Sequence, residues 1–328
     1  MENFNVLVTG GAGFIGSHLI ENLIERGTKG ITVIDNLSTG NYNYISKYVE
    51  TNQIKFVKAD LTSDNDSLKG SLKDIDTVFH FSAYPVVKMG YDNPKRSFID
   101  DVQITFNLLE SIRKSNVKNI VFSSSSTVYG KATIIPTPEN YGPLIPISHY
   151  GSSKLACESL ICSYCYNYGL SSQIFRLANV IGSRNNHGII WDFINKIKMD
   201  KTKLSMLGDG SQKKSYIHIK DCIDGILHCV NCRSSERANI INIGNIDSVD
   251  VFTIAKIVSK VMRVDSIKFS LITATLDGSG WIGDVKNMTL DISKLKRMGF
   301  FPKHSSAAAI EKATSDILGA IQLSKCNS

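Results

Sequence analysis

The chain has no long uninterrupted hydrophobic run, and this absence limits the classes of protein to which it can belong. No apolar segment approaches the roughly 18 residues that a helix needs to cross a bilayer. A strand-like run, FNVLVT, begins at residue 4, which leaves no room for a signal peptide. There is also no internal repeat and no low-complexity tract. We therefore predict a globular, cytoplasmic protein.

A strong excess of charge of one sign is also missing. Of the 328 residues, 20% are charged and 42% are hydrophobic, and the net charge is +7. The lysines and arginines are scattered, so the short basic stretch at 196–203 fits a solvated face better than a nucleic-acid-binding stripe. A mild positive balance suits a small anionic ligand. A chain of this length can bury a large core and form two lobes.

The cysteines do not form a convincing metal-binding pattern. Seven cysteines include two C-x-x-C spacings, Cys162–Cys165 and Cys229–Cys232. Such pairs can bind zinc, but both lie in helix-like stretches with no clear turn between the cysteines. We favour buried reduced thiols over a zinc site and predict no metal.

Short β-rich runs alternate with helical patterns from the start of the chain. Helix-like segments at 15–26, 99–115 and 151–168 separate most of these runs. The alternation predicts an α/β fold: a Rossmann-type, doubly wound parallel sheet with helices on both faces. The expected strands are 5–9, 31–35, 54–60, 77–81, 119–124, 172–177 and 239–244.

The chain opens with a strand, a glycine turn and a helix. Gly10, Gly13 and Gly16 are spaced G-x-x-G-x-x-G, as a turn needs if its backbone is to approach a pyrophosphate. The helix start at Phe14 and Ile15 then offers unpaired N–H groups to the phosphates. A glycine-rich turn without a ligand is the alternative. The strand, helix and next strand are all present, so we predict a dinucleotide site.

The acid that ends the second expected strand indicates which dinucleotide binds. Asp35 lies 19 residues beyond Gly16. A carboxylate there accepts hydrogen bonds from the adenosine ribose and repels a 2′-phosphate, so we favour NAD over NADP. A strand-capping acid is the alternative reading. Asp60 and Leu61 are expected at the adenine edge, and the other expected cofactor residues are Asn36, Ser38, Gly40 and Ala83.

The alternation of strands and helices loosens after about residue 178. We therefore predict an NAD-binding domain over residues 1–178 and a smaller C-terminal substrate-binding lobe over 179–328. The strand expected at 239–244 would return to the sheet of the first domain.

A pattern typical of catalysis follows the fifth expected strand. The stretch FSSSSTVYG (122–130) holds five consecutive hydroxyl side chains, which suit neither a helix nor an apolar strand face. Downstream, Tyr150 and Lys154 are four residues apart and so share one face of a helix. Such a pair is common by chance. A catalytic role for this pair is supported by the dinucleotide fold, the hydroxyl run and the stretch HFSAY (80–84).

Together these motifs resemble the extended short-chain dehydrogenase/reductase family, particularly UDP-galactose 4-epimerases and related nucleotide-sugar enzymes. The resemblance spans nearly the whole chain and keeps the order of the motifs. The matching stretches are TGGAGFIGSH, DNLSTG (35–40), HFSA, FSSSSTVYG, YGSSK, RLANVIGSR (176–184), LGDGSQKKSYIHIKD (207–221) and GDVKNMTLDISKLKRMGF (283–300).

The resemblance implies roles for single residues. Tyr150 would be the acid/base, Lys154 would hold the nicotinamide ribose and favour the phenolate, and Ser125 would bond the sugar O4. A base working near pH 7 needs its tyrosine pKa lowered by about three units, roughly 4 kcal/mol. Two cations, Lys154 and the oxidised nicotinamide ring, can supply this. The implied substrate residues are Ser125, Ser126, Thr127, Asn179, His187, Lys214, Tyr216 and Met288.

The hydroxyl run also bears on the type of reaction. In related 4,6-dehydratases an Asp-Glu pair occupies the positions that Ser126 and Thr127 hold here. Hydroxyls are poor general acids and bases for eliminating water. The resemblance therefore implies NAD-dependent epimerisation at C4 of a UDP-sugar, without elimination. A 4,6- or 5,6-type dehydratase remains an alternative. A non-catalytic NAD sensor is a third reading, which the Ser125–Tyr150–Lys154 set argues against.

Several positions depart from the pattern of the family. Asp101 and Ile104 stand where relatives usually have Asn and Gly. Lys214 stands where many have a diphosphate-binding arginine, and no arginine precedes Gly283-Asp284, where another is typical. A lysine keeps the charge but loses the bidentate fork, so the nucleotide is the least certain part of the substrate. Help from Lys213 or Arg184 is an option.

Two positions bear on the sugar, and two segments on assembly. The resemblance places at Met288 the residue that decides whether a 2-N-acetyl group fits, with a core methionine as the alternative. His187 is either a polar contact at the sugar or a loop cap. The segments 99–115 and 151–168 would pair in a homodimer, unless the sheet simply covers their apolar faces. We predict no nucleic-acid or membrane partner.

Overall fold

The structure is a computed structural model, and it describes residues 4–85, 91–232, 234–273 and 275–326. The chain divides into two compact units. The first unit consists of Met1–Val128, His149–Arg176 and Ile226–Ile241, and the second unit consists of Tyr129–Ser148, Leu177–Gly225 and Asn242–Ser328.

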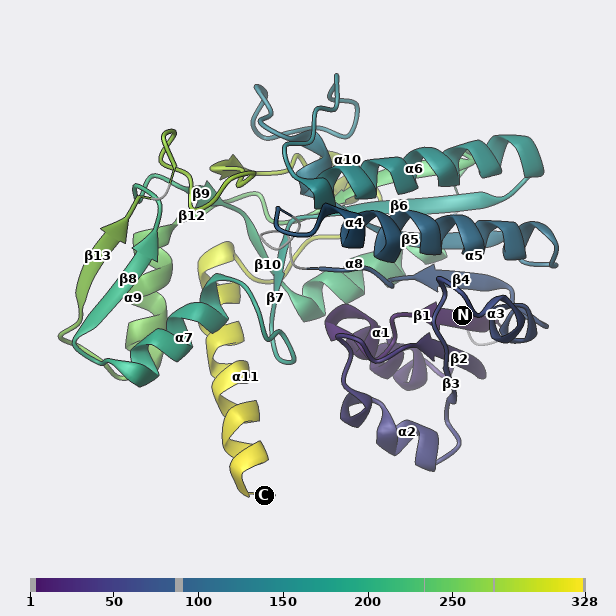
Figure 1. The fold of residues 1–328 in the computed structure, drawn as a ribbon, viewed down its shortest axis with the longest axis horizontal. Helices are drawn as coiled ribbons and strands as arrows, with labels where there is room; N and C mark the ends of the chain where they lie inside the picture. Colours follow the sequence, from purple (N-terminus) through teal and green to yellow (C-terminus); the bar gives the residue numbers. More distant parts are fainter. Residues whose placement is uncertain (1–3, 86–90, 233, 274, 327–328) are drawn as a thin grey trace. The chain divides into compact units, whose positions relative to one another are not determined.

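A seven-stranded sheet forms the centre of the first unit (Figure 1). Its strands are β1 (Asn5–Thr9), β2 (Gly30–Asp35), β3 (Lys55–Lys58), β4 (Thr77–His80), β5 (Asn119–Ser125), β6 (Ser171–Leu177) and β11 (Ala238–Ile243). They lie in the order β11-β6-β5-β4-β1-β2-β3, and the pairs β1–β2, β1–β4, β2–β3 and β4–β5 are parallel. All seven expected strands are present, and the strand expected at 239–244 does return to the sheet. The α/β fold of Rossmann type is confirmed.

Helices cover the sheet because its strands are apolar on both faces. The helices described in this unit are α1 (Phe14–Glu25), α2 (Ser46–Glu50), α3 (Asn65–Ser71), α4 (Pro94–Ser97), α5 (Ile104–Arg113) and α6 (His149–Tyr168), with 3-10 turns at η1 (Tyr42–Tyr44) and η4 (Ser126–Tyr129). The helix α8 (Ile219–Asn231) belongs to this unit from Ile226 onwards, and α2 buries none of its residues. Leu7, Val78 and Phe122 of the sheet pack with residues of α3, α5 and α6 in one core. α5 and α6 run side by side over it (Figure 1).

The segment before α5 is not a regular α-helix. The sequence analysis expects one helix over 99–115, whereas the structure has a π-helical turn, η3 (Phe98–Gln103), followed by α5. A π turn widens the helix by one residue, and such turns are frequent at functional sites. This one buries the acidic residue Asp101, which is 1% exposed.

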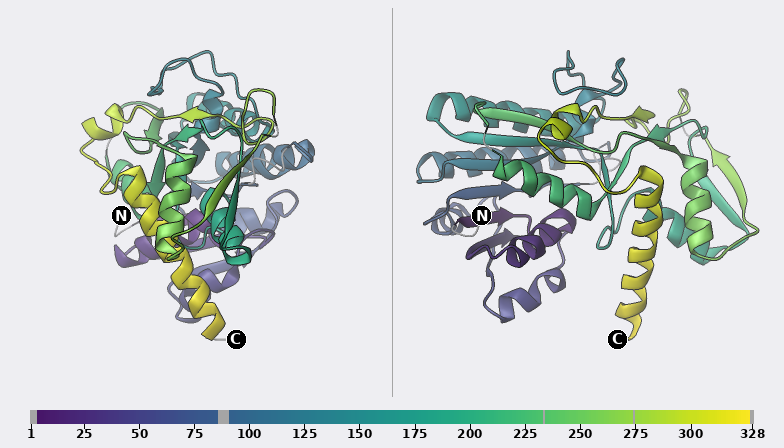
Figure 2. Two further views of the ribbon diagram at one scale, coloured as in Figure 1. Left: turned by 90° about the vertical axis from the view of Figure 1, so that its left-hand side faces the viewer. Right: turned by 180° about the vertical axis from the view of Figure 1, so that it is seen from behind.

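Among its described residues, the second unit contains three small sheets and four complete helices (Figures 1 and 2). The sheets are β7 (Asn179–Ile181) with β10 (Tyr216–His218), β8 (Lys203–Leu207) with β13 (Lys268–Ile272), and β12 (Val249–Asp250) with β9 (Lys213–Lys214) and β14 (Asn287–Met288). The helices are α7 (Ile189–Met199), α9 (Val251–Val261), α10 (Ser293–Arg297) and α11 (Ser306–Cys326). α7, α9, α11 and β8 share one apolar core.

Residues 129–148 belong to the second unit, although the sequence analysis places them in the first domain. Their backbone bonds to later segments: Thr137 forms a β-bridge with Leu290, and the Asn242 amide donates to the Thr137 carbonyl at 2.9 Å. Residues 226–241 instead cluster with the first unit, because α8 and β11 lead the chain back to the sheet. A single cut of the chain therefore does not describe its two units.

Two predicted features can be compared with the described part of the chain. No helix among the described residues is long and apolar enough to cross a membrane. The cysteines of the two C-x-x-C spacings are free thiols, as are Cys157 and Cys222. Within the part of the chain that the structure describes, no three His, Cys, Asp or Glu side chains gather in a way that could hold a metal ion.

Candidate active site

The turn between β1 and α1 is closed too tightly for any residue but glycine. Gly10 has a φ of +70°, and an added Cβ would lie 2.7 Å from the backbone nitrogen of Ser82. At Gly16 an added Cβ would collide with the Gly10 carbonyl oxygen. Among the described residues no side chain caps α1, and its first turn carries no acid. The Gly13 N–H already donates to the Gly10 carbonyl at 3.1 Å, so the N–H groups of Phe14 and Ile15 in the first turn are the ones that suit an anionic ligand.

The turn lies where the sheet order reverses. In the sheet, β2 and β3 lie on one side of β1, and β4, β5 and β6 lie on the other side. Ligands of open α/β sheets bind beyond the carboxyl ends of the strands at such a point. Gly10 follows β1, and the Phe81–Ala83 backbone follows β4, so both belong to this edge.

Asp35 has a structural task at this edge as well as a predicted cofactor role. Its Oδ2 accepts the Ala12 N–H at 3.0 Å, and its Oδ1 accepts the Leu37 N–H at 2.8 Å. Burial raises the pKa of Asp35, and these two hydrogen bonds act in the opposite direction. An added Cβ at Gly40 would lie 3.0 Å from Asp35 Oδ1, so glycine gives this carboxylate room. Each oxygen keeps acceptor capacity for a ribose hydroxyl.

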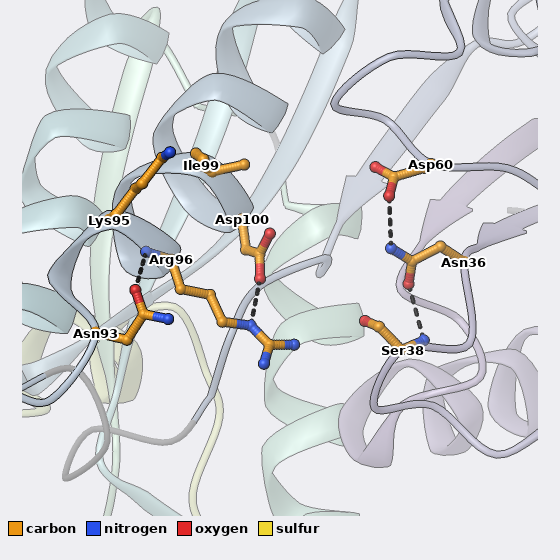
Figure 3. Close-up of a pocket in the computed structure, with 8 residues that line it drawn as sticks. All are labelled: Asn36, Ser38, Asp60, Asn93, Lys95, Arg96, Ile99 and Asp100. Carbon is orange, nitrogen blue, oxygen red and sulfur yellow. Dashed lines mark hydrogen bonds and ion pairs between the residues drawn. The ribbon is translucent and has the colours of Figure 1, made fainter.

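A cavity of about 290 Å³ opens at Asn36, the residue that follows Asp35 (Figure 3). Asn36, Ser38 and Asp60 line one side, where the Asn36 amide donates to Asp60 Oδ2 at 3.3 Å. Burial opposes ionisation of Asp60, but hydrogen bonds from Thr62 and Asn36 lower its pKa below the usual value. These are three of the predicted cofactor residues, and they line one side of the same cavity. Leu61 differs, because its side chain is buried in the core.

The other side of this cavity escaped the sequence analysis. It is lined by Asn93, Lys95, Arg96, Ile99 and Asp100, from α4 and η3 (Figure 3). Asn93 caps α4 by accepting the Arg96 N–H at 3.2 Å. The stretch DNPKRS carries an N-cap asparagine followed by proline, a helix-start signal that would have located this short helix.

Two serines of the hydroxyl run are buried and have structural roles. The Ser124 hydroxyl donates to Oε1 of Glu158 on α6. Glu158 also accepts the Arg176 guanidinium, through Nη2 at 2.8 Å and Nε at 3.0 Å, and both side chains are only 3% exposed. Ser123 supplies its carbonyl to Lys154. These contacts bind α6 to β5 and β6.

The next residues of the run face the tyrosine. Ser125 ends β5, and its Oγ accepts the Thr127 N–H at 3.2 Å and the Thr127 hydroxyl at 2.9 Å. Ser125 also hydrogen-bonds to Tyr150, which lowers the tyrosine pKa. Ser126 is buried at the start of η4. The serine and tyrosine that the sequence analysis pairs therefore do meet.

Tyr150 and Lys154 lie on one face of α6, as their spacing predicts. Lys154 is 2% exposed, and its Nζ donates to the Ser123 carbonyl at 2.9 Å. The same Nζ lies 4.8 Å from the centre of the Phe122 ring and 5.7 Å from that of Tyr150. The ammonium is thus buried at the end of β5, close to the phenol.

The groups around Tyr150 act on its pKa in opposite directions. Burial raises it, and negative charge at Asp101 and at Cys157 raises it further, while the Ser125 hydrogen bond lowers it. The sequence analysis expects Lys154 and the oxidised nicotinamide ring together to favour the phenolate, and within the chain the Lys154 ammonium donates to the Ser123 carbonyl. The groups of the chain by themselves therefore hold Tyr150 as a neutral phenol.

The predicted substrate residues of the second unit lie around neighbouring strands. Asn179 and Tyr216 pair in register, and the Asn179 amide donates to the Ser215 carbonyl at 3.1 Å. Met288 pairs in register with Lys214. Burial, followed by the Asp284 carboxylate, raises the pKa of Tyr216. The sequence analysis thus selected residues that lie together within this unit.

Lys214 and His187 have partners that the sequence did not indicate. The Lys214 ammonium is paired with Asp284 and lies 5.3 Å from the centre of the Trp281 ring. His187 donates its backbone N–H to Asn185 and lies 3.4 Å from Asn186 Oδ1, both in its own loop. Burial lowers the pKa of His187, so this ring is neutral near pH 7. These contacts favour the loop-capping reading for His187.

Comparison with known proteins defines the class to which this fold and this site belong. Residues 6–244 match the model of the NAD dependent epimerase/dehydratase family. A Methanocaldococcus jannaschii protein named "Putative UDP-glucose 4-epimerase" is 33% identical over 91% of this chain and 93% of its own length. UDP-glucuronic acid decarboxylase 3 of Arabidopsis thaliana is 29% identical over 92% and 85%. A crystal structure of a UDP-galactose 4-epimerase has a TM-score of 0.85 and 37% identity, covering 97% of this chain and 99% of that one.

The chain therefore belongs to the NAD-dependent epimerase/dehydratase family, as its motifs suggest. NAD is the cofactor of this family, and the residues present fit it. The glycine turn leaves no room for a Cβ at Gly10 or Gly16, and the cavity at Asn36 is lined by groups that can bond an adenosine.

We predict that Gly10→Ala weakens NAD binding at least tenfold (~1.4 kcal/mol), because the added methyl group displaces the Ser82 backbone. Isothermal titration with NAD measures the effect. Gly27→Ala is the matched control: Gly27 has a similar φ of +75°, but its added Cβ meets nothing within 4 Å. Equal affinities for the two variants would mean that the close approach at Gly10 is unimportant.

We also predict that Glu158→Gln destabilises the fold by about 3–5 kcal/mol, since it leaves the Arg176 guanidinium buried without its countercharge. Urea unfolding measures the change. Asp66→Asn, which removes a solvent-exposed ion pair with Lys69, is the control and should have little effect. A similar loss in both variants would contradict the role given to the buried pair.

Proposed function

We propose that the protein is an NAD-dependent 4-epimerase of UDP-linked sugars that works through a transient 4-keto sugar. The arrangement of Ser125, Tyr150 and Lys154 beside the dinucleotide turn carries this proposal. It is supported by the names of relatives that act on UDP-glucose or UDP-galactose. A cytoplasmic location is also part of the proposal, and it is supported by the sequence alone.

Each of the three residues has a separate task at the sugar. Bound NAD supplies the oxidation and re-reduction at C4. Tyr150 takes the proton from the O4 hydroxyl and later returns it, and Ser125 holds O4 by a hydrogen bond. Lys154 keeps a positive charge near the phenol while bonded to the Ser123 carbonyl. Because the chain alone raises the pKa of Tyr150, the positive nicotinamide ring has to contribute to the lowering.

The hydroxyl run favours epimerisation over loss of water. Ser126 and Thr127 cannot supply the acid and base that elimination needs. The carboxylate that the run does contact, Glu158, is neutralised by Arg176 and buried. It is therefore not available as a general acid at the sugar.

Lys214 is the proposed contact to the diphosphate of the substrate. Its ammonium is paired with Asp284, so binding a diphosphate would exchange one anionic partner for another. A single ammonium gives a point charge and no bidentate fork. The proposal that the nucleotide is UDP therefore depends on the charge of Lys214 and not on a bidentate contact to the diphosphate.

A homodimer is part of the same proposal. Four large aromatic side chains of η3, α5 and α6 are exposed, which favours their burial against a second copy. They are Phe98, Phe106, Tyr166 and Tyr168.

Proton NMR of UDP-glucose, UDP-N-acetylglucosamine and UDP-glucuronate, each with NAD, tests the reaction type. Inversion at C4 is the expected result. Loss of the C6 hydroxymethyl pattern would support a dehydratase instead. Release of carbon dioxide from UDP-glucuronate would support a decarboxylase, because a 4-keto uronate is a β-keto acid and needs no further acid. No change in any sugar would favour an NAD-binding protein without catalysis.

We predict that Tyr150→Phe slows the reaction at least ~10²-fold while NAD binding and the melting temperature stay unchanged, because only the acid/base hydroxyl is lost. Single-turnover rates measure the chemical step. Tyr166→Phe, on the same helix with an exposed side chain, is the control and should keep the wild-type rate. Near wild-type turnover in Tyr150→Phe would overturn the assignment.

We further predict that UDP-N-acetylglucosamine is used at least as well as UDP-glucose, and that Met288→Tyr selectively impairs the N-acetylated sugar. Met288 is 8% exposed, so a larger side chain overpacks its surroundings by roughly 1–3 kcal/mol. The ratio of kcat/KM for the two sugars is the measurement. Met288→Leu conserves volume and should leave the ratio unchanged. An unchanged ratio in Met288→Tyr would identify a core methionine.

A further inference from the structure

A buried carboxyl group with an unsatisfied oxygen lies in the π-helical turn η3. The side chain of Asp101 is 1% exposed. Its Oδ1 accepts the Tyr84 N–H at 3.1 Å. Its Oδ2 is buried and has no hydrogen-bond partner within the described part of the chain. A buried carboxylate without full pairing is strongly unfavourable, so this group favours its neutral form.

The proposed acid/base of α6 interacts with this carboxyl group. Cys157 donates to the Asp101 carbonyl at 3.4 Å, and Lys154 and Tyr150 lie one and two turns earlier on the same helix face. The Lys154 charge favours ionised Asp101, and ionised Asp101 in turn opposes the phenolate of Tyr150. The charge of Asp101 is therefore favoured by the ammonium of Lys154 and acts on the phenol of Tyr150.

The neutral groups around Asp101 are already satisfied. His80 lies 2.8 Å from the Thr9 hydroxyl and 2.9 Å from the Thr105 hydroxyl, and Thr105 donates to the Asp101 carbonyl at 2.7 Å. Burial, and then the charge of Lys154, lowers the pKa of His80 to about 3, so the ring is uncharged. It adds no charge near Asp101.

The remaining charges near Asp101 are few. On η3 the neighbouring Asp100 raises the pKa of Asp101, but Asp100 is itself paired with Arg96 of α4 at 3.0 Å. On α6, burial raises the pKa of the Cys157 thiol to about 11, so that it is neutral near pH 7. Lys154 is therefore the cation that acts on Asp101 from α6.

We propose that Asp101 is a positioning residue that controls the proton affinity of Tyr150 through its own charge. In its ionised form its negative charge opposes the phenolate of Tyr150, and in its neutral form this opposition is absent. The proposal rests on the proposed function, in which Tyr150 is the acid/base. It adds a residue that never touches the substrate.

The pH at which this control operates follows from the burial of Asp101. Burial raises its pKa to about 6, against the action of Lys154 and of the Tyr84 N–H. The native protein therefore holds a proton that the unfolded chain has already lost at pH 5. Stability falls as the pH rises from about 4 to about 6 and stays lower above that range.

Asp101→Asn tests the proposal because asparagine keeps the shape and can accept the same Tyr84 N–H without the charge. Tyrosine ionisation of the NAD-loaded protein is followed by ultraviolet difference spectroscopy, and the same titration of Tyr150→Phe in each background isolates Tyr150. We expect the Tyr150 midpoint to fall by roughly one pH unit in Asp101→Asn. The acid limb of kcat/KM should move to lower pH by a similar amount.

Two further measurements separate a charge effect from a structural one. Asp100→Asn makes the same substitution one residue away and should move the Tyr150 midpoint less than Asp101→Asn does. The melting-temperature difference between Asp101→Asn and wild type should grow from pH 4 to pH 6 and then stay level. A constant difference would show that Asp101 does not titrate in this range and would overturn the proposal.

The outcomes also distinguish this proposal from the proposed function. An unchanged Tyr150 midpoint in Asp101→Asn overturns the role of Asp101 even if the protein is an epimerase. A lowered midpoint in a protein that changes no sugar supports the coupling while refuting the proposed reaction. The tyrosine titration needs no turnover, so it tests the role of Asp101 whether or not the protein is an epimerase.

Discussion

The burial of two opposite charges on α6 is the constraint on which the site depends. Lys154 and Glu158 are four residues apart, and both are almost fully buried. A buried charge has to be satisfied, and β5 does so with consecutive residues: the Ser123 carbonyl accepts from Lys154, and the Ser124 hydroxyl donates to Glu158. The end of β5 therefore fixes the rotation of α6, and with it the direction in which Tyr150 points.

This constraint explains why hydroxyl residues end the strand. Small side chains leave room for the lysine and glutamate to reach the strand, and serine can bond either charge. The next position, Ser125, then meets Tyr150 because α6 is already fixed. Two structural residues, Ser123 and Ser124, are thus followed directly by Ser125, to which we assign a chemical role. A larger apolar residue at Ser124 would leave Glu158 with one partner fewer.

Much of the fold could be predicted because buried parallel strands read as short apolar runs separated by helical patterns. All seven strands of the sheet were recognisable in this way. The π turn was not, since FIDDVQ carries no signal that separates it from an α-helix. The placement of 129–148 also escaped prediction, because it depends on bonds such as that between Asn242 and Thr137, which are 105 residues apart.

The site was predictable where its residues are close in sequence, as with Tyr150 and Lys154. The contacts between residues distant in sequence could not be predicted: Glu158 and Ser124 are 34 residues apart, and Lys214 and Asp284 are 70 apart. The raised pKa of Tyr150 in the chain without its cofactor could not be predicted for a related reason. Spacing places a cation nearby, but packing decides how much water the phenol loses and where the ammonium points.

The raised pKa of Tyr150 has a consequence for the proposed mechanism. In the chain alone, burial and the charge at Asp101 outweigh the Ser125 hydrogen bond, so the phenol keeps its proton. A positively charged nicotinamide ring would lower the pKa of Tyr150, because it would place a positive charge near the phenol without exposing the phenol to water. Tyr150 would then become a base only in the loaded protein. Proton removal and oxidation at C4 would in that way be tied to the same binding event, and the chain without its cofactor would hold no reactive phenolate.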